Sequence, residues 1–302
     1  MTQDLAGLLA AGERAAFHGR PAAGVEPLRS AVSVAQAAGL VAEASAASWL
    51  LGVCLASAGR FGGALEVLEP LLGAADTPED KVLAALASAT VASVHRQLGR
   101  HTVAQDYDER ALQDSEGQGE AGYDALLGLC TDAVGQNEAA TAVARLREAE
   151  ALVDGGLDGW RQAVRLDWVR AEVALLEGRP EDAVAAAHAA VELAEHSGAP
   201  RHVAKSLLFL GVGELESGRV PEAAAVLRRA GLLAESLGTL PLQWPVRAVL
   251  GALLAGDDPV ESARCLTSAR RAAAAIAEDL PPDLRAAWTA RPDVQALMAS
   301  ES

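Results

Sequence analysis

The chain has 302 residues, of which 51% are hydrophobic and 3% are aromatic, and its formal net charge is −16. That charge repels nucleic acid phosphates and anionic lipid headgroups, which argues against both as partners. The acidity is explained most simply by solubility and would also suit a basic partner, while the abundance of alanine and leucine favours helices throughout.

The amino terminus and the cysteines bear on location. Residues 1–6 have no basic start followed by an apolar segment, so we expect no signal peptide. The sequence has no uninterrupted run of about 18 apolar residues, so we expect no membrane-spanning helix. The cysteines Cys54, Cys130 and Cys265 form no CxxC pair, which argues against a zinc ribbon or a redox pair. We therefore expect a cytoplasmic protein.

One short pattern recurs seven times along the chain, at intervals of 38 to 41 residues. Each copy has a turn residue, namely Gly19, Gly59, Gly99, Asn137, Gly178, Gly218 and Asp258. A small residue stands seven positions earlier, at Gly12, Gly52, Ala92, Cys130, Ala171, Gly211 and Gly251. Another stands five positions later, at Gly24, Ala64, Ala104, Ala142, Ala183, Ala223 and Ala263. A fixed period of this size is typical of a repeat array.

The sixth copy shows what one repeat builds. Residues 203–217 have apolar residues at helical spacing, and Gly218 ends this helix because glycine readily adopts the left-handed cap conformation. Pro221 and Glu222 then suit the first turn of a second helix. Two helices approach to about 8 Å only where the contact residues are small. The pattern therefore predicts an antiparallel hairpin closed by its small residues.

The spacing resembles that of the tetratricopeptide repeat (TPR). The clearest copies are Leu51-Gly52…Gly59…Ala64…Leu68 and Leu210-Gly211…Gly218…Ala223…Leu227…Ala230. The resemblance implies an all-α fold, a right-handed α-solenoid of about seven TPR-like antiparallel hairpins over residues 1–280. The period near 40, rather than about 34, predicts helices longer by roughly a turn.

The last segment, residues 281–302, begins with two proline-led stretches, Pro281-Pro282-Asp283 and Arg291-Pro292-Asp293. Terminal units of a solenoid must cover an exposed apolar face, so we expect two short capping helices here. The segment from Leu284 to Pro292 also resembles the end of repeat arrays in large bacterial regulators.

Several motifs that could indicate a cofactor or metal site lack the surrounding sequence that such a site requires. Gly117, Gly119 and Gly122 spell GxGxxG, but no strand precedes them, so we interpret them as a loop between repeats. No two histidines have the four-residue spacing of helical metal ligands, and we expect no metal and no cofactor.

An acidic run in the second helix of the third repeat is interpreted as solvent-facing. Its members are Asp106, Asp108, Glu109, Asp114 and Glu116. No pair of catalytic groups has a meaningful spacing, so we expect no enzyme.

In the family that the chain resembles, ligands lie on a concave groove lined by the first helices. That register places Glu13, Trp49, Ser93, Arg96, Gln97, Asp124, Thr131, Arg165, Trp168, Glu172, Lys205 and Leu208 in the groove. As candidate ligand-binding residues we select Trp49, Arg96, Gln97, Thr131, Arg165, Trp168, Glu172 and Lys205. Tryptophan and arginine are common anchors of interfaces, although both tryptophans would equally suit ordinary packing.

The sequence thus predicts a non-catalytic adaptor or scaffold that binds a protein or peptide, including one with acidic groups, in its groove. The alternative is a sensor module of a bacterial regulatory system that binds a small molecule or peptide. An enclosed pocket of about 300 Å³ or more would favour a small molecule, and an open trough a peptide or protein. Self-association stays open.

Overall fold

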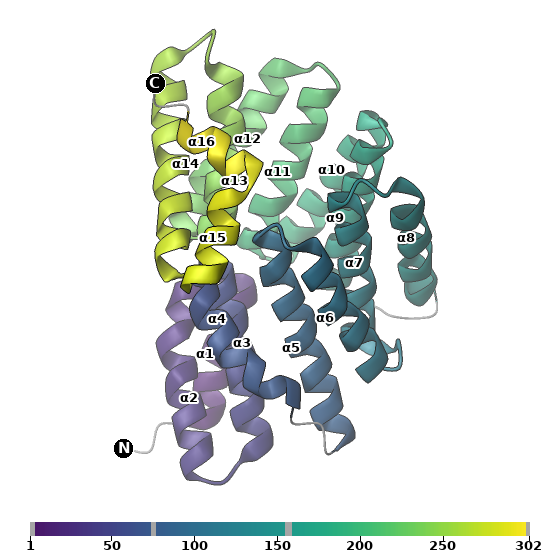
Figure 1. Cartoon of the computed structure of the whole chain (residues 1–302), viewed down its shortest axis with the longest axis vertical. Coiled ribbons are helices and arrows are strands. Elements are labelled where there is room, and N and C mark those ends of the chain that lie inside the picture. The colour runs from purple at the N-terminus through teal and green to yellow at the C-terminus, as the bar shows by residue number, and fades with distance from the viewer. Residues whose placement is uncertain (1–3, 74–76, 155–158, 300–302) are drawn as a thin grey trace.

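A computed structural model describes residues 4–73, 77–154 and 159–299. Over these residues the fold is all-α, as predicted, and the first fourteen helices form seven antiparallel hairpins (Figure 1). The hairpins are α1 (Leu5–His18) with α2 (Val25–Ala37), α3 (Val41–Ala58) with α4 (Phe61–Leu68), α5 (Pro78–Gln97) with α6 (His101–Asp114), α7 (Gly119–Gly135) with α8 (Ala139–Asp154), α9 (Trp160–Leu176) with α10 (Pro180–His196), α11 (Pro200–Glu216) with α12 (Val220–Leu237), and α13 (Leu240–Leu254) with α14 (Pro259–Asp279). Helices α15 (Pro282–Ala290) and α16 (Pro292–Ala299) follow.

Most predicted turn residues have the left-handed backbone that ends a helix. Gly59, Gly99, Asn137, Gly178 and Gly218 have φ between 61° and 86°. The first and last copies differ, because Gly19 and Asp258 have negative φ, at −145° and −137°. Asp258 instead caps α14, where its carboxylate accepts a hydrogen bond from the Glu261 amide at 2.9 Å.

The small residues close the hairpins. A Cβ atom added at Gly52 would lie 2.4 Å from Leu68 Cγ, so only glycine lets α3 and α4 meet. Cys130 is fully buried, and its thiol lies 3.1 Å from the Ala142 carbonyl across the hairpin, which agrees with a packing role. The seventh copy is shifted by one residue, since Ala263 is exposed and the buried position is Ser262.

The close approach predicts a large difference between two glycines of one hairpin. We expect Gly52→Ala to destabilise the protein by about 1–3 kcal/mol, because its methyl group overlaps Leu68. Gly63→Ala, whose Cβ would lie 3.8 Å from Leu55, is the matched control and should be neutral or stabilising. Urea unfolding of both variants measures the difference, and equal stabilities would contradict the packing account.

Helix α3 is the one described helix that is long and apolar enough to cross a membrane, which the count of uninterrupted apolar residues did not predict. Its buried residues include Leu50, Leu51, Cys54 and Leu55, which pack in a core shared with neighbouring hairpins. Packing inside the array thus accounts for the buried part of this apolar content.

The array closes on itself. Helix α3 contacts α13 and α4 contacts α14, so that the last repeat lies against the second (Figure 1). Residues of α15 share a core cluster with α3 and α4. The Asp279 carboxylate pairs with Arg60 and accepts hydrogen bonds from the amides of Gly62, at 2.9 Å, and Gly63, at 3.3 Å. Thr239 donates to the Ser57 carbonyl at 2.7 Å. We call this junction the seam.

The two terminal helices take part in the seam as well as covering α14. Trp288 of α15 is 1% exposed, and its indole N–H donates to the Ala273 carbonyl of α14 at 3.0 Å. It belongs to the same core cluster as Leu50 and Phe61 of the second repeat. The two helices therefore join the end of the chain to its beginning, while a domain boundary at residue 280 stays a prediction.

Candidate functional site

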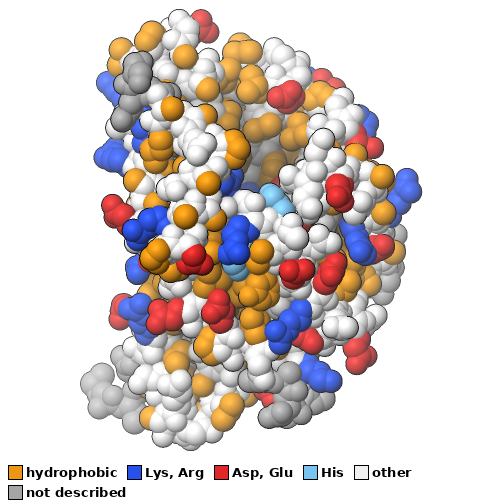
Figure 2. All heavy atoms as spheres, viewed as in Figure 1, with side chains coloured by type: hydrophobic (Ala, Val, Ile, Leu, Met, Phe, Trp, Pro, Cys, Tyr) orange, Lys and Arg blue, Asp and Glu red, His pale blue; other side chains and the backbone are white. Residues whose placement is uncertain are grey.

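The closed array surrounds a cavity of about 480 Å³, and the face drawn in Figure 2 is hollowed near its centre. First helices of the hairpins supply most of its wall, with α3, α5, α7, α9, α11 and α13 all contributing. All eight candidate residues selected from the sequence line this cavity, as do Ser93, Asp124 and Leu208. Glu13, in contrast, is exposed and does not line it. Ligand binding by these residues stays a prediction.

Sequence reasoning missed several lining residues. They include Arg161, Arg201, His202, Trp244, Trp288 and Arg291. Arg161 and Arg201 each stand four positions before a predicted groove residue, so helical periodicity was a signal that placed them on the same face. Arg291 and Trp288 reach the cavity only because the seam closes, and no local pattern indicates that closure.

Arg96 on α5 lies at the centre of a buried ion cluster. Its guanidinium pairs with Asp108 of α6 and, at 2.9 Å, with Asp132 of α7. His101 is a further partner of Asp132, at 3.0 Å. A Cβ added at Gly128 would lie 2.0 Å from the Asp108 carboxylate, so that glycine makes room for the cluster.

The solvent-facing interpretation of the acidic run is wrong for Asp108. Its side chain is 1% exposed, and burial raises the pKa of this carboxyl well above its usual range, against the opposing charge of Arg96. Asp106 and Glu109 are exposed to solvent, as the interpretation expected. The side chain of Asp108 is instead buried, where it pairs with Arg96 of the preceding helix. Asp108 therefore helps to hold a cavity-lining arginine.

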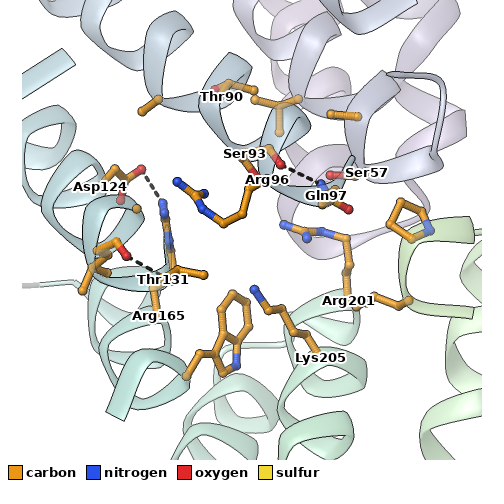
Figure 3. A pocket seen from close by; sticks show the side chains of 18 of the residues that line it. Ser57, Thr90, Ser93, Arg96, Gln97, Asp124, Thr131, Arg165, Arg201 and Lys205 are labelled. Carbon is orange, nitrogen blue, oxygen red and sulfur yellow. Dashed lines mark hydrogen bonds and ion pairs between the residues drawn. The ribbon is translucent and has the colours of Figure 1, made fainter. Parts of the chain in front are cut away.

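A second ion cluster lies between α7 and α9. Asp124 pairs with Arg165 (Figure 3) and accepts a hydrogen bond from Arg161 at 3.1 Å. Both arginines line the cavity. Arg161 is also paired with Glu120, which is 41% exposed. One buried carboxylate thus serves two arginines.

Neighbouring first helices are also joined by bonds between residues about one repeat apart. The Trp49 indole donates to Thr90 at 3.2 Å, Thr131 to Glu172 at 3.0 Å, and the Trp168 indole to Ser206 at 2.8 Å. Both tryptophans are therefore packed and hydrogen-bonded within the wall, as well as lining the cavity. The hydrogen bonds that hold the first helices of the cavity wall together therefore recur with the same spacing as the repeats.

Helix α11 contributes Arg201 and Lys205, which point into the cavity (Figure 3). The Lys205 ammonium lies 4.3 Å from the centre of the Trp168 ring, and His202 stacks on that tryptophan at 5.3 Å. Burial, together with the charges of Arg165 and Arg201, lowers the pKa of Lys205 to about 8. Burial likewise lowers the pKa of Arg201 to about 10. Positive charge is crowded here.

The lowered pKa of Lys205 makes stability depend on pH. Below pH 8 the Lys205 amine is protonated in both the folded and the unfolded protein, and its buried charge destabilises the folded state. Between pH 8 and about 10.5 this amine is protonated only in the unfolded protein, so the free energy of unfolding rises with pH. We expect Lys205→Met to stabilise the protein at pH 7 by about 1–2 kcal/mol, after allowance for the lost contact with Trp168. Urea unfolding at pH 7 and pH 10 should show this advantage shrinking. A constant difference would exclude a buried charge as its source.

The GxGxxG motif and the cysteines can also be located in the described residues. Gly117 lies in the left-handed turn between α6 and α7, as predicted for the GxGxxG motif. Gly119 and Gly122 instead belong to the first turn of α7, so the interpretation of all three glycines as a loop between repeats is wrong for these two. No group of three or more histidine, cysteine, aspartate or glutamate side chains in the described part of the chain is placed to hold a metal ion. The three cysteines are buried thiols.

No protein-family model and no curated protein matches this chain, but solved structures share its fold. A Rap protein complexed with competence and sporulation factor superposes with a TM-score of 0.66 at 11% identity, covering 99% of this chain and 87% of that one. Aspartyl phosphate phosphatase F from Bacillus subtilis gives a TM-score of 0.50 at 11% identity, covering 98% and 82%.

A third similar structure is the Signal Transduction ATPase with Numerous Domains (STAND) protein with a tetratricopeptide repeat sensor from Pyrococcus horikoshii. Its TM-score is 0.53 at 12% identity, and the match covers 93% of this chain but 42% of that longer one. These likenesses confirm a tetratricopeptide-like helical-repeat fold.

Proposed function

We propose that this chain is a non-catalytic regulatory module that holds a small acidic ligand, either a short peptide or a small molecule, inside its closed array. The observation that carries the proposal is a reversal of charge. The whole chain has a net charge of −16, whereas six arginine or lysine side chains and two carboxylates line the cavity. A concave site with one sign of charge concentrates ligands of the opposite sign.

The size of the cavity favours a small molecule or a short peptide over a folded partner protein. Its volume of about 480 Å³ lies within the range of roughly 300–1,000 Å³ found for small-molecule sites. Two of the similar structures, a complex with a competence and sporulation factor and a tetratricopeptide repeat sensor, agree with ligand sensing by this fold. A cytoplasmic location belongs to the same proposal.

Tryptophan fluorescence tests the proposal, because Trp168 lines the cavity. We expect saturable quenching by at least one of three acidic probes: the tripeptide Glu-Glu-Glu, propane-1,2,3-tricarboxylate or glycerol 2-phosphate. The tripeptide Lys-Lys-Lys should have no effect. The variant Trp168→Phe should lose part of the signal, since Trp49, Trp244 and Trp288 also line the cavity.

Affinity for the best probe should fall about tenfold in Arg165→Ala, which equals about 1.4 kcal/mol. Arg147→Ala is the matched control, because Arg147 is exposed on α8 and away from the cavity. The proposal fails if no acidic probe saturates, or if Arg165→Ala binds as tightly as the control.

A further inference from the structure

Two cationic residues of the cavity, Arg201 and Lys205, differ from the others because no carboxylate of the described residues lies within ion-pair distance of them. They stand four residues apart on α11, so their side chains lie on one helical face, and both point into the cavity (Figure 3). Neither forms an ion pair with any residue that the structure describes. The Arg201 Nε is buried and has no hydrogen-bond partner among those residues. An unpaired buried donor of this kind is costly, which points to a missing acceptor.

The neighbouring cations already have partners. Arg96 pairs with Asp108 and Asp132, and Arg165 pairs with Asp124. Glu172 is the carboxylate that faces Lys205; it accepts a hydrogen bond from Thr131 and does not reach ion-pair distance of the ammonium. The uncompensated charge is therefore concentrated on the α11 pair.

The balance of charge around this pair indicates how much negative charge a ligand would bring. Four cations of α9 and α11 line this side of the cavity, namely Arg161, Arg165, Arg201 and Lys205, against the two carboxylates Asp124 and Glu172. Glu120, at 41% exposed, adds a carboxylate only from outside the cavity. A single carboxylate would leave one cation unpaired, whereas a phosphate monoester carries roughly −1.5 to −2 charges on one compact group.

Resting on the proposed function, we infer that Arg201 and Lys205 form a subsite for a phosphate monoester group of the ligand. A guanidinium binds phosphate oxygens in a planar fork and an ammonium binds them as a point charge, so one of each, a helical turn apart, suits a tetrahedral group. The cavity wall across from them carries neutral groups, including Ser57, Ser93 and Gln97, which suit an uncharged remainder of the ligand (Figure 3). The phosphate would belong to a small phosphorylated metabolite or to a phosphorylated peptide side chain.

The lysine content of the chain provides a direct test. Lys81 and Lys205 are its only lysines, and Lys81 is exposed, so it is an internal control within the same molecule. The protein is labelled with acetic anhydride at pH 8, and modification of each lysine is followed by mass spectrometry. We expect saturating glycerol 2-phosphate to slow the labelling of Lys205 at least about fivefold, because phosphate holds the amine in its charged form, and to leave Lys81 unchanged.

Binding by the full-length protein is measured in parallel by calorimetry. The probes are glycerol 2-phosphate, the tripeptide Gly-phosphoSer-Gly, and propane-1,2,3-tricarboxylate. Either phosphate probe should bind at least about tenfold tighter than the tricarboxylate and lose about that factor in Arg201→Gln, with Arg147→Gln as the control. The tighter of the two phosphate probes identifies the source of the group. Circular dichroism verifies that Arg201→Gln is folded, and the protection of Lys205 in the unaltered protein does not depend on any variant.

The outcomes separate this inference from the proposed function. Binding of the tricarboxylate with no preference for phosphate, or no protection of Lys205, overturns the phosphate subsite and leaves the acidic-ligand module standing. Binding of none of the acidic probes, including Glu-Glu-Glu, overturns both.

Discussion

Replacing Arg96 with methionine is expected to destabilise the protein by about 3–5 kcal/mol, the usual effect of removing one partner from a buried ion pair. Asp108 and Asp132 are each 1% exposed and both pair with this guanidinium, although Asp132 also contacts His101. Because they belong to α6 and α7, the loss should loosen the junction between the third and fourth repeats. Urea unfolding at pH 7 measures the effect.

A matched control is Arg179→Met, since Arg179 also pairs with two carboxylates, Glu177 and Asp182, but at the surface. Exposed pairs contribute little to stability, so the control should lose far less of its free energy of unfolding than Arg96→Met. The loss in Arg96→Met should also shrink as the pH falls, because burial raises the pKa of Asp108 and its protonation removes the unpaired charge. Equal losses in the two variants would contradict a buried cluster.

The second large effect is expected at the seam, where Trp288→Ala should cost about 3–5 kcal/mol. The indole is fully buried, and its ring meets that of Trp244 edge-on at 5.6 Å. Its core cluster includes residues of the second and third repeats, so hydrogen exchange should increase in α3 and α5 as well as in α14.

Met298→Ala on α16 is the control for this prediction, since Met298 is 39% exposed and its loss should be small. If hydrogen exchange in Trp288→Ala changes only from α13 to α16, the terminal helices merely cap the array. That result would remove their role in joining the two ends of the chain.

The sequence predicted those features that follow from local periodicity. A repeat of about 40 residues places first helices side by side, and Trp49, Arg96, Arg165 and Lys205 from four of them line the same cavity. That these residues bind a ligand stays a prediction. The closure was beyond this reasoning, because the pair of Arg60 and Asp279 joins residues about 220 positions apart with no shared pattern.

The same limit explains two particular residues. Asp108 was assigned to a solvent-facing acidic run because the sequence of its own helix does not indicate that Arg96, on the preceding helix, pairs with it. Arg201 was overlooked although helical spacing from Lys205 places it on the same face. Charge on a repeat array is therefore best assessed across neighbouring repeats rather than along one helix.

A distance measured across the seam tests the central claim most directly, namely that the array closes around its cavity. Glu69 and Asp283 are exposed and border the same outer cleft between the second repeat and α15, while the native cysteines are buried. Spin labels on Glu69→Cys and Asp283→Cys in one molecule should give a single narrow, short distance by double electron–electron resonance. A broad or long distribution would show an open array and contradict the closed cavity.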